Sequence, residues 1–228
     1  KSTLLYLMAG LLTPYKGQVL FDDTDVRKRF PHTMRDIFIV PDEYKLPRVS
    51  LTEYIRTNGV FYPHFSKEDM LHYLDVFGMN EDVNLGELSL GQGKKVFMSF
   101  AMAAHTKVLL MDEPFSALDP LVRTVLQDQI AMIHQKFGTT IVFVTHDMQE
   151  ALKLACRIGV MHQGRLVQVD TPQDIQNHPA DDYVRSLFGT AQPENTASAD
   201  EVINLYRRLD ADGKARVREY WVQNRMDV

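Results

Sequence analysis

Two adjacent carboxylates, Asp112 and Glu113, follow an apolar run at residues 108–111 and precede a proline. A buried apolar strand that ends in acids delivers them to the carboxyl edge of a parallel sheet, where open α/β folds bind ligands. Because Mg²⁺ usually takes only one or two carboxylates besides phosphate oxygens, we expect Asp112 to hold Mg²⁺. Glu113 would orient and deprotonate an attacking water. On its own, the tripeptide at residues 112–114 fits equally well a strand that ends in a turn and has no catalytic role.

A histidine follows a second run rich in β-branched residues, at positions 140–145. His146 lies 146 − 113 = 33 positions after Glu113. If both runs are strands of one parallel sheet, the two side chains can emerge at the same edge. From the strand alone, a purely structural histidine is the alternative.

Residues 88–92 read Leu-Ser-Leu-Gly-Gln, and the apolar stretch 97–104 follows shortly after. Ser89 is therefore placed to cap a helix whose free N–H groups face outward and attract phosphate. An ordinary serine-capped helix without a ligand is the alternative. Asp119 stands before Pro120 and, as an isolated acid, fits a helix cap as well.

In this order, these segments resemble the ATP-binding-cassette (ABC) ATPase family. Residues 88–92 match its signature motif, residues 108–113 its Walker B strand, residues 116–119 its D-loop and His146 its switch histidine. Leu90 departs from the glycine that is more frequent in the signature motif. The resemblance implies an α/β fold: a P-loop NTPase (RecA-like) core with a parallel sheet and an inserted helical subdomain.

The resemblance also implies roles for these residues. Ser89, Gly91 and Gln92 would cover the ATP of a second ATPase subunit in a head-to-tail dimer, and Asp119 would make a contact across that dimer. His146 would hydrogen-bond the γ-phosphate and the attacking water, a role that suits the donor and acceptor nitrogens of imidazole.

The first three residues, Lys1, Ser2 and Thr3, look like the end of a P-loop. By resemblance, Lys1 reaches the β- and γ-phosphates, Ser2 is an Mg²⁺ ligand and Thr3 contacts the α- and β-phosphates. The glycines whose N–H groups converge on the phosphates do not precede them in this sequence, so we expect an N-terminally truncated cassette. Restoring a glycine loop should tighten MgATP binding.

Asp42 follows the apolar run 37–40 and Pro41, where family members usually carry a glutamine that touches Mg²⁺ and senses the membrane partner. A carboxylate can still bind at the nucleotide site, but when ionised it cannot donate a hydrogen bond. A solvated loop at residues 42–43 is the alternative.

Composition indicates a folded protein, with 45% hydrophobic residues in a chain of 228. The net charge of −5 and the absence of a basic cluster beside aromatic residues argue against a nucleic-acid partner. The apolar stretch 4–12 is too short to span a bilayer, so any membrane contact should be peripheral. The single cysteine, Cys156, excludes an internal disulfide and fits a reducing cytosol.

The order of patterns along the chain predicts its organisation. Strand-like runs alternating with helical patterns favour a parallel α/β core; they lie at residues 17–21, 37–40, 108–111, 140–145, 158–161 and 165–169. In the strand-poor region between them, six residues are expected to be core: Met70, Tyr73, Phe77, Met98, Phe100 and Met102. The predicted parts are a RecA-like core at 1–51 and 106–170, a helical signature subdomain at 52–105, C-terminal helices at 171–188, a linker at 189–199 and a helical tail at 200–228.

The expected function is that of an ATPase subunit, hydrolysing MgATP as a dimer to drive membrane permease subunits from the inner face of the cell membrane. Residues 1–112 look most like small bacterial export-type ABC ATPases, and residues 115–188 like importers of glycine betaine, choline and related osmoprotectants. The two portions suggest different substrates, as a composite chain would. Alternatives are an export-type ATPase and a non-hydrolysing dimerisation or regulatory module. An ABC ATPase of DNA repair or translation is weaker, because neither tandem cassettes nor a basic surface is evident.

Overall fold

The computed structural model describes residues 1–188 of the chain. The chain divides into two compact units, residues 1–180 and residues 181–228. Helix α9 (Asp182–Phe188) lies in the described part of the second unit, and the other described helices and strands belong to the first. The predicted linker at 189–199 and helical tail at 200–228 lie outside the described residues.

A parallel sheet of three strands forms the centre of the first unit, in the order β3 (Ile37–Val40), β4 (Val108–Asp112) and β5 (Thr140–Val144). In the register, Val40 pairs with Met111, and Asp112 pairs with Val144. The carboxyl ends of β4 and β5 therefore meet at one edge, as the sequence predicted.

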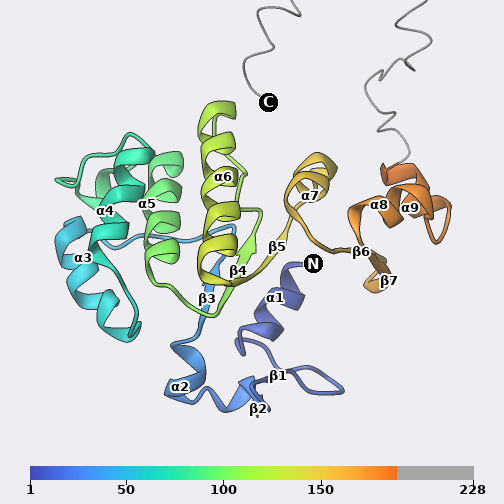
Figure 1. The fold of residues 1–228 in the computed structure, drawn as a ribbon. Coiled ribbons are helices and arrows are strands. Elements are labelled where there is room, and N and C mark those ends of the chain that lie inside the picture. The colour runs from blue at the N-terminus through green and yellow to red at the C-terminus, as the bar shows by residue number, and fades with distance from the viewer. Residues whose placement is uncertain (189–228) are drawn as a thin grey trace, which may run out of the picture. The chain divides into compact units, whose positions relative to one another are not determined.

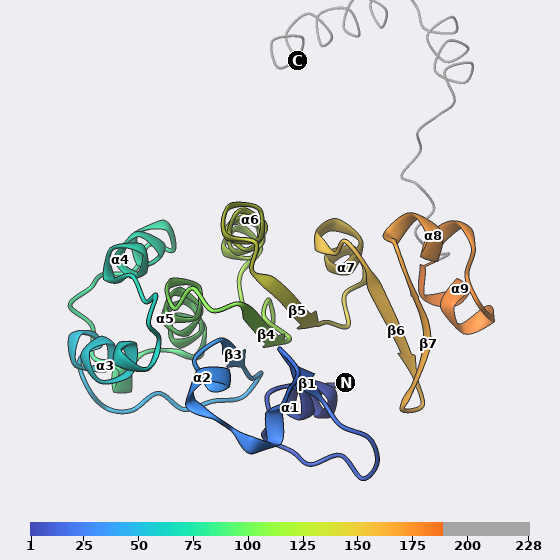
Figure 2. The ribbon, with the colours of Figure 1, turned by 60° about the horizontal axis from the view of Figure 1, so that its bottom comes forward.

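Strand β4 reads as a continuous apolar run because both of its faces are covered. Leu110 packs on one face against Leu5 and Ala9, which belong to α1 (Ser2–Met8) and its cap. Leu109 and Met111 point to the other face, into the cluster that includes residues of α6 (Pro120–Phe137). Figure 2 shows α1 and α6 on opposite faces of β4 and β5.

The predicted strands at 158–161 and 165–169 form, and the run at 17–21 is a strand only at residues 20–21; these strands pair antiparallel. β1 (Leu20–Phe21) pairs with β2 (Thr24–Asp25), and β6 (Ile158–His162) pairs with β7 (Arg165–Asp170). A parallel connection needs a crossover of a dozen or more residues, whereas only Gln163 and Gly164 join β6 to β7, both with positive φ. The parallel pattern expected along the whole chain therefore holds for the three central strands alone.

Residues 52–105 are helical, as predicted. They carry α3 (Leu51–Asn58), η2 (Gly59–Phe61), α4 (Lys67–Val76), η3 (Leu85–Glu87) and α5 (Leu90–Ala103), which gather beside β3 in Figure 1. Serine side chains cap α3, α4 and α5 by accepting a hydrogen bond from a first-turn N–H. All six residues expected in the core here are buried, which confirms that prediction.

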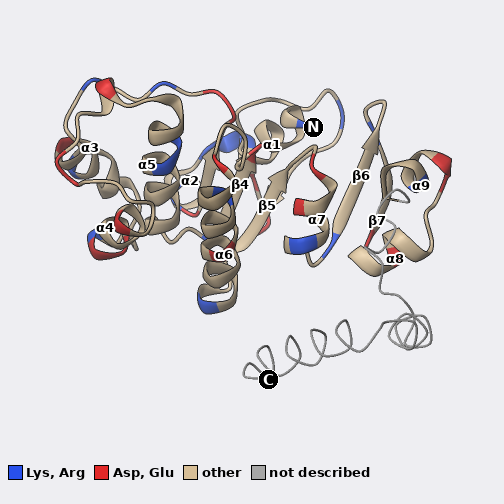
Figure 3. Ribbon diagram, turned by 90° about the horizontal axis from the view of Figure 1, so that it is seen from above, with Lys and Arg blue, Asp and Glu red and all other residues tan. Residues whose placement is uncertain are grey.

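Shorter helices complete the unit: η1 (Val26–Lys28), α2 (Pro31–Met34), α7 (Met148–Leu154) and α8 (Pro172–Asn177). Thr171 caps α8 with Pro172 in its first position, as predicted. Acidic residues stand at the start of α7 and Lys153 at its end, an order that suits the helix dipole (Figure 3). Among the described residues, none of the helices is long and apolar enough to cross a membrane.

Leu110→Ala tests how far the site depends on the packing of β4. Leu110 is fully buried, so its truncation should lower the free energy of unfolding by about 2–5 kcal/mol. The matched control is Leu121→Ala on α6, where the leucine is 75% exposed and the same change should cost less than about 0.5 kcal/mol. Urea denaturation followed by circular dichroism measures both, and equal effects would contradict this account of the core.

Candidate functional site

The two carboxylates at the end of β4 have different surroundings. The side chain of Asp112 is buried, and its Oδ1 atom has no hydrogen-bond partner within the described part of the chain. Glu113 adopts a left-handed backbone conformation with φ +47°, which is unfavourable by roughly 1–2 kcal/mol for a residue with a Cβ. Its N–H donates to the carbonyl of Val144 at 2.9 Å, so the turn is tied to β5.

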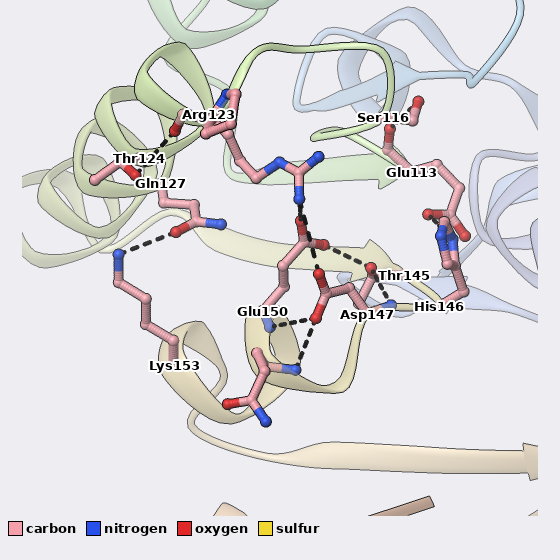
Figure 4. Close-up of polar contacts among 12 residues, drawn as sticks. Glu113, Ser116, Arg123, Thr124, Gln127, Thr145, His146, Asp147, Glu150 and Lys153 are labelled. Carbon is pink, nitrogen blue, oxygen red and sulfur yellow. Dashed lines mark hydrogen bonds and ion pairs between the residues drawn. The ribbon is translucent and has the colours of Figure 1, made fainter. Parts of the chain in front are cut away.

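Glu113 and His146, which are far apart in the sequence, meet at this edge. His146 Nδ1 lies 2.8 Å from Glu113 Oε2, and the imidazole is 78% exposed (Figure 4). The hydrogen bond to the carboxylate raises the pKa of His146 above its ordinary value, because it stabilises the imidazolium form. The structure thus brings together the two residues for which the sequence predicted catalytic roles.

The segment around His146 is held by a polar network between α6 and α7. Thr145 Oγ1 donates to Glu150 Oε2 at 2.6 Å and accepts from the N–H of Asp147 at 3.0 Å. Arg123 of α6 lies 3.8 Å from Asp147 and 3.9 Å from Glu150. Burial raises the pKa of Glu150, while Arg123 and the Thr145 hydroxyl act in the opposite direction. Figure 4 shows these contacts at Thr145 and Asp147, the two residues that flank His146 in the chain.

A second group of polar contacts surrounds the carbonyl of Glu113. Lys94 of α5 donates from Nζ to this carbonyl and to Ser116 Oγ, each at 2.6 Å. Ser116 Oγ also lies 2.9 Å from the Glu113 carbonyl and 3.0 Å from Asp42 Oδ1. The exposed carboxylate of Asp42 is 3.8 Å from the Lys94 ammonium.

Lys94 and Ser116 did not emerge as site residues from the sequence. One signal was available: the buried stripe of α5 that includes Met98, Ala101 and Met102 continues one turn earlier at Lys94. A lysine on such a stripe needs polar partners, and here it finds them at the end of β4.

The surroundings of Asp112 fit a bound Mg²⁺ ion. An unpartnered, buried carboxylate oxygen is costly unless a cation or donor reaches it. Within residues 1–188 no group of three or more His, Cys, Asp or Glu side chains could hold a metal by itself. Mg²⁺ does not need one, since it keeps several waters and takes phosphate oxygens as ligands.

Sequence comparison decides the family. Residues 1–116, half of the 228-residue chain, match the model of the ABC transporter family. The chain belongs to the ABC transporter family.

Similar proteins include ATP-binding proteins of several transport systems. The glycine betaine/proline betaine transport protein ProV of Salmonella typhimurium is 34% identical over 217 residues, covering 89% of this chain and 53% of ProV. The carnitine transport protein OpuCA of Listeria monocytogenes is 34% identical over 201 residues, covering 83% and 50%. The sulfate/thiosulfate import protein CysA 1 of Rhizobium meliloti is 36% identical over 233 residues, covering 94% and 67%. The chain thus spans about half the length of the betaine and carnitine proteins.

Solved structures share the fold. An ATP-binding subunit of an ABC transporter matches with a TM-score of 0.68 at 24% identity, over 83% of this chain and 77% of that one. A dimeric ATP-binding cassette in a post-hydrolysis state, bound to ADP and Pi, matches with 0.65 at 24% identity, over 75% and 80%. The expected P-loop NTPase fold with a parallel sheet is thereby confirmed.

The residues that resemble the end of an ABC P-loop lie at the start of α1. Lys1 Nζ is 3.3 Å from the carbonyl of Thr145, the residue before His146. Ser2 and Thr3 are exposed in the first turn of α1, and no hydrogen bond from their side chains reaches another described residue. Lys1 therefore lies near the Glu113–His146 contact, while Ser2 and Thr3 are left free.

The predicted helix cap at Ser89 forms, as a capping box between Ser89 and Gln92 at the start of α5. The N–H of Ser89 donates to Gln92 Oε1 at 3.0 Å, and the N–H of Gln92 donates to Ser89 Oγ at 3.3 Å. A Cβ on Gly91 would lie 3.4 Å from the carbonyl of Ala117 in the D-loop. Asp119 caps α6 by accepting from the N–H of Val122 at 3.0 Å. Within the described chain, no hydrogen bond joins these residues to Glu113 or His146.

The contact between Glu113 and His146 predicts a titration. Glu113→Gln removes the carboxylate that stabilises the imidazolium form, so the pKa of His146 should fall toward its ordinary value. NMR titration of the imidazole C–H signals measures this, with the exposed His64 as internal reference. A His146 titration that stays unchanged would show that the two side chains do not interact in solution.

Proposed function

We propose that this chain is the ATP-hydrolysing subunit of an ABC transporter and drives solute transport through membrane permease subunits. The observation that carries the proposal is the 2.8 Å contact between His146 Nδ1 and Glu113 Oε2 at the carboxyl edge of β4 and β5. A carboxylate and an imidazole at this edge suit the activation of a water beside a terminal phosphate. A non-hydrolysing module has no use for this pair and is not favoured.

Each residue has a distinct role in this proposal. Glu113 accepts a proton from the attacking water. The water oxygen bonds to the γ-phosphorus, and the bond between the γ-phosphorus and the bridging oxygen of the departing ADP breaks. His146 donates a hydrogen bond to the γ-phosphate, and its contact with Glu113 orients both side chains. Lys1 and Thr3 contact the phosphates. Ser2 and Asp112 would hold Mg²⁺ at the phosphates, where the ion would neutralise phosphate charge.

We propose further that two such subunits act as a head-to-tail dimer. In it, Ser89, Gly91 and Gln92 of one subunit cover the ATP of the other, and Asp119 lies between them. Two exposed apolar side chains support a covered face here: Leu90 beside Ser89 is 67% exposed, and Leu121 beside Asp119 is 75% exposed.

The permease subunits would hold the dimer at the inner face of the cell membrane. The names of the similar proteins support a transport role, and they differ in cargo, from betaines and carnitine to sulfate. Because residues 115–188 look most like osmoprotectant importers, we propose that the transported solute is an osmoprotectant and that the transporter takes it up. Asp42 is a further nucleotide-site candidate, at the position where the family couples to its membrane partner.

Glu113→Gln tests the proposed base. Turnover of ATP should fall by about 10²- to 10⁴-fold, because the amide cannot accept the proton from water. ATP binding should persist, so a stable dimer should accumulate with ATP and be visible by size-exclusion chromatography. The matched control is Glu81→Gln, the same change at an exposed loop residue, which should leave turnover at the level of the unaltered protein. Substantial hydrolysis by Glu113→Gln would assign the base elsewhere, with His146 as the next candidate.

A further inference from the structure

Lys94 is a buried cation to which the proposed function gives no role. Its side chain is 3% exposed, on a face of α5 that otherwise buries apolar groups such as Met98 and Met102. Burial lowers the pKa of the Lys94 ammonium, and the nearby carboxylates of Asp42, Glu113 and Asp112 act in the opposite direction. A buried ammonium is retained only where close polar partners offset its lost hydration.

The partners of Lys94 all lie at the site. Its Nζ atom donates to the carbonyl of Glu113 and to Ser116 Oγ, each at 2.6 Å, and lies 3.8 Å from Asp42 Oδ1. These contacts join α5 to the loops after β4 and β3. Hydrogen bonds from a charged donor in a buried setting are the strong ones, so this ammonium holds the Glu113 carbonyl firmly.

The main chain of Glu113 needs such an anchor. At φ +47° it occupies a conformation that residues with a Cβ rarely adopt. Its N–H is bound by Val144 on one side, and its carbonyl is bound by Lys94 on the other. With both ends of the residue held, the direction of its Cα–Cβ bond is fixed, and from there the carboxylate reaches His146.

We propose that Lys94 is a positioning residue for hydrolysis: its ammonium holds the strained main chain of Glu113 and thereby aims the Glu113 carboxylate at His146. The inference rests on the proposed role of Glu113 as the base. It also connects Asp42 to Glu113 indirectly, since Asp42 lies against both Lys94 and Ser116, which contact the Glu113 carbonyl.

Lys94→Met and Lys95→Met form a matched pair of variants. Methionine is close to lysine in length and lacks both the charge and the donor. Lys95 is the next residue of α5, is half-buried and also donates to a backbone carbonyl, that of Phe77 at 3.1 Å. Any general effect of removing a lysine from α5 should therefore appear in both variants.

The first measurement is the titration of His146 by NMR in the nucleotide-free protein. Loss of a nearby positive charge should by itself raise the pKa of His146, whereas loss of the Glu113 contact should lower it. We expect the pKa of His146 to fall in Lys94→Met and to stay unchanged in Lys95→Met. A rise, or no change, in folded Lys94→Met would overturn the proposal.

Two further variants keep the test decisive if Lys94→Met does not fold. Ser116→Ala removes the second contact to the Glu113 carbonyl with a small change in volume, and should lower the pKa of His146 in the same direction by less. Lys94→Arg keeps a charged donor and should retain most of the unaltered titration. An unchanged pKa in Ser116→Ala, or a fall in Lys94→Arg as large as that in Lys94→Met, would contradict the positioning role.

The second measurement is the kinetics of ATP hydrolysis. Lys94→Met should lower kcat about 10- to 100-fold and leave KM within about twofold, because a misplaced base affects the chemical step more than binding. Lys95→Met should leave both values near those of the unaltered protein. Substantial turnover by Glu113→Gln would refute the proposed role of Glu113 as the base, whereas a lack of ATP hydrolysis by the unaltered protein would refute the proposed function itself. If Glu113→Gln is inactive and Lys94→Met matches Lys95→Met, only the inference about Lys94 fails.

Discussion

The left-handed turn at Glu113 is the constraint on which the site depends. This one residue follows the central strand, begins the turn that its carbonyl closes with the N–H of Ser116, and presents its carboxylate to His146. Its conformation is unfavourable in isolation and persists because hydrogen bonds from Lys94 and to Val144 hold it on either side. Strain at the proposed base is thereby maintained by contacts from two other elements, α5 and β5.

Apolar packing supplies the precision of these polar contacts. One hydrophobic cluster contains Leu109 and Met111 of β4 together with Met98 and Phe100 of α5, so the strand that carries Glu113 and the helix that carries Lys94 share a core. Close-packed interiors leave little room for displacement. The 2.6 Å bond from Lys94 to the Glu113 carbonyl is therefore set by many contacts that are themselves non-directional.

Carboxylates outnumber the cations that lie among them at this edge. Lys94 lies among Asp42, Asp112 and Glu113, and Arg123 lies between Asp147 and Glu150. Asp112 Oδ1 has no hydrogen-bond partner among the described residues. An edge so rich in carboxylates repels a nucleotide unless cations accompany it, and this favours the metal-bound phosphate of the proposed function over a bare one.

Local signals made much of the fold predictable, and long-range contacts set the limit. The caps at Ser89, Asp119 and Thr171 act within four residues and were readable from the sequence, as were the apolar strands that end at Asp112 and before His146. The prediction of parallel strands was wrong for β6 and β7, which pair antiparallel. It followed the alternation of strands and helices along the chain and gave no weight to the two-residue turn between these strands. The polar contacts around the Glu113 carbonyl join positions 42, 94, 113 and 116. No spacing in the sequence connects these positions, because the packing of α5 against the sheet brings them together. The sequence does place a charged residue, Lys94, on the stripe of α5 whose other positions are apolar and buried. A charged side chain at a buried position costs stability, and proteins retain such residues mainly where they hold a functional group in place.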